Sequence, residues 1–111
     1  MTSPVYREVP KQPGEQVRIA GFDFAPQMES GEFIADAEVT IVDPEGEDVT
    51  DDMLVTDSVE IRDGESVDDS VVVFEVKDGE HNLDYVATVI ADVSGRPLHG
   101  EIILPVRERP H

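Results

Sequence analysis

The chain contains no cysteine and no tryptophan, and only two of its 111 residues are lysine. The absence of cysteine excludes disulfides, thiolate metal sites and a cysteine nucleophile. No apolar stretch approaches the roughly 18 residues of a membrane-spanning helix, and the N-terminus has no basic segment followed by an apolar run. We therefore expect a protein that stays where it is made or leaves within a larger assembly.

The acidic residues are concentrated in the middle of the chain. Residues 29–84 contain twenty Asp or Glu and two basic residues, whereas residues 1–28 and 85–111 each contain three acids and three bases. The formal net charge of −18 thus lies in the centre. Such a field repels nucleic acid and anionic membrane, so we expect neither as a partner. The two neutral ends are the expected places for another protein to dock.

The balance of charged residues also indicates the surroundings of the protein. Two lysines stand against twenty-six acidic residues. Carboxylates hold water and cations. The apolar stems of lysine instead favour association once salt screens the repulsion between copies, which at molar ionic strength extends only about 3 Å. A salt-loving host is the simplest interpretation, with an ordinary acidic mesophile protein as the alternative. Disorder is disfavoured because 39% of the residues are apolar and alternate regularly.

Apolar residues recur with a period of two almost throughout, which indicates β-strands. The clearest strand spans 83–93, and alternation resumes over 98–106 after the turn residues Ser94-Gly95-Arg96-Pro97. A change of apolar parity at Gly21 indicates a β-bulge in an earlier strand. Further strands are predicted over 37–41, 55–62 and 71–76, the last being apolar on both parities, as in a central strand.

These short strands, with turn residues about every ten positions, describe an all-β protein. We predict an immunoglobulin-like antiparallel β-sandwich of about seven strands with extended N- and C-terminal arms. A helical turn is expected over 50–55, where Thr50-Asp51-Asp52 resembles a cap. Tyr85, near the start of the strand over 83–93, is expected to return its hydroxyl to the backbone at a corner of the sandwich.

The two ends of the chain resemble arms. Residues 1–15 contain three prolines and a glycine, too many for a central strand. We therefore divide the chain into an extended N-terminal arm over 1–15, a sandwich over 16–106 and a C-terminal tail over 107–111. An extended arm can add a strand to the sheet edge of a neighbour. The expected partner-binding residues are Val5, Tyr6, Val9, Val106, Arg107 and Arg109.

Dense carboxylates over 43–52 resemble a calcium loop, but Gly46 is the fourth residue and Leu54 the twelfth, which does not fit EF-hand spacing. We interpret the segment as a solvated acidic loop and predict no metal site. The acidic pairs and the histidines likewise show no catalytic setting and no ligand spacing; they are Asp51-Asp52, Asp68-Asp69, His81, His99 and His111. No serine lies in a nucleophile elbow, and no glycine-rich phosphate motif is present. We predict no enzyme activity, no cofactor and no small-molecule substrate.

Several short motifs follow one another over residues 10–107. They are Lys11-Gln12-Pro13, Phe22-Asp23-Phe24 with Met28, Gly31-Glu32 with Ile34, Ala37-Glu38-Val39-Thr40-Ile41, the segment from Gly79 to Tyr85, and Ser94-Gly95-Arg96. In this order they resemble the small immunoglobulin-like virion proteins of tailed phages that are described as fiber-tail adaptors or head-tail connectors. With the acidic composition, the resemblance implies a tailed virus of a haloarchaeon.

The resemblance implies a non-enzymatic structural protein of the virion, at the head-tail or tail-fiber junction. Its partners would be other virion proteins, such as portal, capsid, tail or fiber proteins, and copies of itself. A capsid decoration protein and a cellular immunoglobulin-like binding module from a halophile are the alternatives.

Overall fold

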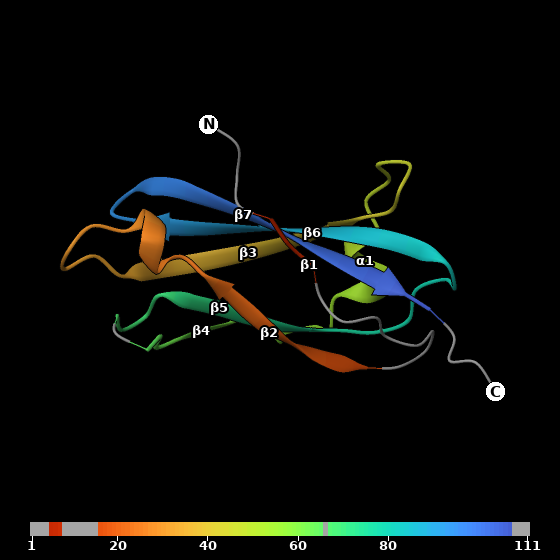
Figure 1. The fold of residues 1–111 in the computed structure, drawn as a ribbon, viewed down its shortest axis with the longest axis horizontal. Coiled ribbons are helices and arrows are strands. Elements are labelled where there is room, and N and C mark those ends of the chain that lie inside the picture. The colour runs from red at the N-terminus through yellow and green to blue at the C-terminus, as the bar shows by residue number, and fades with distance from the viewer. Residues whose placement is uncertain (1–4, 8–15, 66, 108–111) are drawn as a thin grey trace.

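The chain folds into two stacked β-sheets, and the computed structural model describes residues 5–7, 16–65 and 67–107 (Figure 1). Sheet A has the strand order β1-β7-β6-β3, and sheet B has the order β2-β5-β4. The elements are β1 (Val5–Arg7), β2 (Val17–Asp23), the 3-10 turn η1 (Ala25–Gln27), β3 (Ile34–Val42), α1 (Thr50–Met53), β4 (Glu60–Arg62), β5 (Val71–Val76), β6 (Leu83–Val93) and β7 (Arg96–Val106). The prediction of an all-β sandwich is confirmed, and α1 is the only α-helix in these residues.

β6 and β7 form the hairpin that the alternation predicts, and they pair antiparallel over their whole lengths. Only Ser94 and Gly95 lie between the strands, with φ angles of 54° and 80°. Two consecutive left-handed residues give a two-residue turn whose twist matches that of the strands. The turn is shorter than predicted because Arg96 and Pro97 already pair with β6.

β2 carries the bulge predicted at Gly21. Its pairing with β5 shifts register between Ile19 and Phe22, and Gly21 has a φ of 113°. A Cβ at Gly21 would lie 2.7 Å from the carbonyl oxygen of Val72. Only glycine therefore fits both the left-handed backbone and the close approach of β5. The bulge changes the parity of β2 and places Phe22 in the core, 1% exposed.

The core lies between the two sheets. The ring of Phe22 packs 4.6 Å, centroid to centroid, from that of Phe24. On the facing sheet, a Cβ at Gly100 of β7 would lie 2.3 Å from the Phe22 ring, so the missing side chain leaves the space that this ring fills. Phe74 of β5 is fully buried, and β5 is the central strand of sheet B, as predicted.

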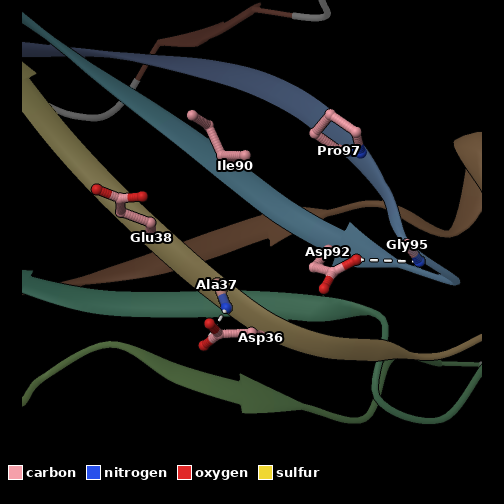
Figure 2. Close-up of a pocket in the computed structure, with 7 residues that line it drawn as sticks. All are labelled: Asp36, Ala37, Glu38, Ile90, Asp92, Gly95 and Pro97. Carbon is pink, nitrogen blue, oxygen red and sulfur yellow. Dashed lines mark hydrogen bonds between the residues drawn. The ribbon is translucent and has the colours of Figure 1, made fainter.

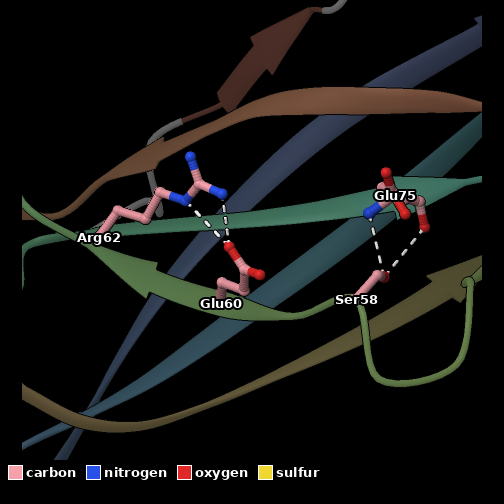
Figure 3. Close-up of polar contacts among 4 residues, drawn as sticks. All are labelled: Ser58, Glu60, Arg62 and Glu75. Carbon is pink, nitrogen blue, oxygen red and sulfur yellow. Dashed lines mark hydrogen bonds and ion pairs between the residues drawn. The ribbon is translucent and has the colours of Figure 1, made fainter.

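The fourth strand is shorter than the prediction over 55–62, because β4 covers only Glu60–Arg62. The chain turns at Asp57, which has a φ of 60°. The Ser58 hydroxyl then accepts a hydrogen bond from the Glu75 backbone N–H at 3.1 Å (Figure 3). A side-chain oxygen thus takes the place of a backbone carbonyl as the acceptor at this point, and regular pairing with β5 starts only at Glu60. Within β4, Arg62 forms an ion pair with Glu60 at 2.6 Å.

The helical turn predicted over 50–55 is confirmed as α1, but the prediction of its cap is wrong. Val49 is the N-cap residue, and no side chain caps the helix. The Thr50 hydroxyl instead accepts a hydrogen bond from the Ile41 N–H at 2.9 Å and donates one to the Asp48 carboxylate at 2.6 Å. Thr50 therefore ties α1 to the edge of β3.

Candidate interaction surface

The outer side of sheet A carries a patch of half-buried β-branched side chains, which we call the outer face. Its members are Val42, Val86, Ile103, Thr40, Thr88 and Ile90. The strand register sets their rows, so that Val42, Val86 and Ile103 lie side by side across β3, β6 and β7. None of the six belongs to the core, unlike the alternating residues of the same strands that face sheet B. The outer face therefore presents mainly methyl groups to solvent.

Carboxylates border the outer face at the end nearest the β6–β7 turn, and we call them the acidic rim: Asp36, Glu38 and Asp92. Asp36 and Asp92 lie directly opposite each other in the pairing of β3 with β6, and Glu38 lies opposite Ile90. All three carboxylates are exposed. Like charges in opposed positions on a sheet repel each other, so the acidic rim costs the free protein stability.

A shallow hollow of about 290 Å³ lies at the acidic rim (Figure 2). It is lined by Asp36, Ala37, Glu38, Ile90, Asp92, Gly95 and Pro97. The Asp92 carboxylate accepts a hydrogen bond from the Gly95 N–H at 3.1 Å, and the Asp36 carboxylate accepts one from the Ala37 N–H at 2.9 Å. The backbone thus fixes two carboxylates beside an apolar floor.

The free edge of β3 is partly occupied by its own chain. The Ile41 N–H donates to the Thr50 hydroxyl, and the Ile41 carbonyl accepts from the Val49 N–H at 2.8 Å. Ala37 alternates in step with Ile41, so its N–H also points to the free edge, where it donates a hydrogen bond to the Asp36 carboxylate. A register shift between Ile34 and Asp36 also interrupts the strand. These features protect an edge against strand addition, so a partner of sheet A has better access to the outer face.

Two of the predicted partner-binding residues lie in a strand of the protein's own sheet. Val5 and Tyr6 lie in β1, which pairs parallel with β7 of its own chain, in the register Val5↔Glu101 and Tyr6↔Ile102. The backbone of this part of the arm therefore completes the protein's own sheet. Val9 and Arg109 lie outside the described residues.

The C-terminal candidates are held by the chain itself. Val106 is fully buried at the end of β7, so its side chain is part of the core and not of an exposed docking surface. Arg107 donates a hydrogen bond to the carbonyl of Leu83 at 3.1 Å and forms an ion pair with Asp84. The alternation along β7 could have revealed the burial of Val106, because Val106 continues the series of inward residues.

The acidic loop after β3 is organised by its own carboxylates. Asp43 accepts hydrogen bonds from the N–H groups of Glu45 and Glu47, both at 2.9 Å. Hydrogen bonds from the Thr50 hydroxyl and N–H lower the pKa of Asp48. Within the residues that the structure describes, no group of three or more His, Asp or Glu side chains is placed to hold a metal ion, and no helix is long and apolar enough to cross a membrane.

Tyr85 forms the predicted corner. Its side chain is 5% exposed, and its hydroxyl accepts a hydrogen bond from the Glu80 N–H at 3.0 Å. We expect Tyr85→Phe to lower the free energy of unfolding by about 1 kcal/mol or more, because the Glu80 N–H loses its partner. Urea denaturation at fixed salt measures this change. A loss below about 0.5 kcal/mol would show that water replaces the hydroxyl without cost.

The chain gives no match to a protein-family model, to a curated protein or to a solved structure. What it can bind therefore follows from its own surface. The outer face of sheet A is an area of uncharged side chains, bordered by the acidic rim and its hollow. Such a surface suits contact with another protein, in which an apolar centre is enclosed by polar groups.

Proposed function

We infer an immunoglobulin-like topology for this sandwich. Numbered along the chain, the second, fifth and fourth strands form one sheet, and the seventh, sixth and third strands lie together in the other. This is the division of strands in immunoglobulin domains, except that the first strand here joins the seventh. The hydrogen bond between Tyr85 and the backbone of Glu80 supports the same topology.

We propose that the protein is a non-enzymatic structural component of a tailed virus particle of a halophilic host, an adaptor or connector at the head-tail or tail-fiber junction. The observation that carries a docking role is the outer face, an uncharged area on a chain with a net charge of −18. A surface that needed only solubility in salt would carry carboxylates there as well. The sequence resemblance supplies the virion as the setting.

In this role the protein works mechanically. Virus components act as symmetric copies, so each copy would present the same surface to a ring or lattice partner. The acidic loops would face solvent, where carboxylates hold water and cations. A decoration protein of the capsid is the alternative, and it differs in being present in far more copies than a ring contains.

Quantitative mass spectrometry of purified particles tests this role. We expect the full chain at a small copy number set by ring symmetry. Deletion of residues 1–9 should abolish incorporation, because it removes β1, the edge strand beside β7, and with it one border of the sheet proposed to dock. The melting temperature should change little, because β1 is a three-residue edge strand.

As a control, Asp51→Asn at an exposed position of α1 should be incorporated like the unmodified chain. Normal incorporation of the trimmed protein would show that the arm does not dock. Absence of the full chain from purified particles would reject the virion role itself.

A further inference from the structure

We infer that the outer face of sheet A docks a different protein, through a flat apolar patch on that protein bordered by lysine or arginine. The inference rests on the proposed function only in assuming a docking role. It adds the chemistry of the partner, which follows from the centre of the face, its acidic rim and the hollow between them.

The centre of the outer face has the composition of an interface core. Val86, Thr88 and Ile90 follow one another along the outer side of β6, the strand that lies between β3 and β7. The neighbours of Thr88 across the strands are Thr40 and Glu101, so the row of residues through Thr88 contains a single carboxylate. Charged residues are depleted in the same way at the cores of protein interfaces. An apolar counterpart on the partner would bury these methyl groups.

The acidic rim sets the charge of the partner. Asp36 and Asp92 place two negative charges at opposed positions of the free protein, and an incoming cation would offset them. The hollow at the rim, of about 290 Å³, has room for a long cationic side chain. Ile90 and Pro97 on its floor would contact the apolar stem, while the carboxylates would meet the charged head group.

A second copy of this chain fits the outer face poorly. Packing two such faces about a twofold axis would leave each acidic rim without an unpaired basic counterpart from the hollow, because its lining side chains are acidic or uncharged and the neighbouring Arg96 is already paired with Glu32. The net charge of −18 on each copy also opposes their approach. Charge complementarity therefore favours a different protein with basic residues around its contact patch.

The test is an NMR titration of the full isotope-labelled chain, at the lowest salt that keeps it folded, with three synthetic peptides. The first has a Val-Thr-Val core flanked by arginines, the second has glutamates in place of the arginines, and the third keeps the arginines around a Gly-Ser-Gly core. We expect the first peptide to shift the amide signals of Thr88, Ile90 and Asp92. Its affinity should exceed that of either other peptide by about tenfold.

Two matched triple variants separate the acidic rim from the general charge. Asp36→Asn, Glu38→Gln and Asp92→Asn together remove three charges but keep the oxygens that accept the Ala37 and Gly95 N–H bonds. Affinity for the first peptide should fall about tenfold, as expected for three exposed ion pairs. The control triple, made of exposed positions outside sheet A that lose the same charge, should change affinity less than about twofold; it is Asp51→Asn, Asp57→Asn and Asp68→Asn.

Each other outcome overturns the inference. Equal weakening by the two triple variants, or shifts spread over the acidic loops, would mean that the peptide binds the general field. If the amide signals of Thr88 and Ile90 shift with protein concentration when no peptide is present, the outer face binds a second copy of the chain. Loss of the virion role with an intact peptide response would reject the proposed function alone, whereas an absent response in a protein that is incorporated would reject only this surface.

Discussion

Replacing Phe22 or Phe74 by alanine should lower the free energy of unfolding by about 3–5 kcal/mol, which is a large part of the stability of a domain. Both rings are at most 1% exposed, and they come from neighbouring strands of sheet B. The loss at Phe22 has a second cause. Its ring fills the space above Gly100, so removing it opens a cavity between the sheets.

Chemical denaturation at constant molar salt measures both losses. Phe33→Ala is the matched control, because this phenylalanine is 58% exposed and should change stability by no more than about 0.5 kcal/mol. Combining Phe22→Ala with Gly100→Ala should cost less than the sum of the single changes, because the new methyl group occupies part of the cavity. Equal tolerance of alanine at Phe22, Phe74 and Phe33 would contradict the inward placement of the two core rings.

The melting temperature should rise steeply between tens of millimolar and molar KCl. Twenty carboxylates over residues 29–84 repel one another at low ionic strength, and salt screens that repulsion. Each kcal/mol of stability gained shifts the midpoint by about 4–8 °C in a domain near this size. Differential scanning calorimetry across the salt range provides the measurement.

Sucrose at matched osmolality is the control, since it favours compact states without screening charge. The triple variant Asp51→Asn, Asp57→Asn and Asp68→Asn should show a shallower salt dependence, because it carries three fewer like charges. A flat profile for the unmodified chain would contradict the interpretation of its composition as an adaptation to salt.

Features set by neighbouring residues were predictable from the sequence. The β6–β7 hairpin follows from alternation on both sides of Ser94-Gly95, and the bulge follows from the parity change at Gly21. The hydrogen bond of Tyr85 follows from its place after a glycine-containing turn. In each case the backbone preference of one or two residues decides the local geometry.

Features that depend on distant pairing were not predictable in the same way. Alternation shows which side of a strand is apolar, but it does not show which strand lies beside it, so the pairing of β1 with its own β7 was missed. The outer face was missed for a related reason. Alternation over 83–93 gives Thr88 and Ile90 the outward parity, but their neighbours on β3 and β7 are set by register.

The occupied edge of β3 bears on the fate of the protein at high concentration. In concentrated salt the repulsion between acidic copies is screened, so charge no longer keeps their strands apart. A bare edge would then act as a template for fibril growth. Because Thr50 and Asp36 hold backbone donors of β3, this side offers an incoming strand few partners. Hydrogen bonding, which salt does not screen, therefore protects the protein from aggregation where electrostatic repulsion has failed.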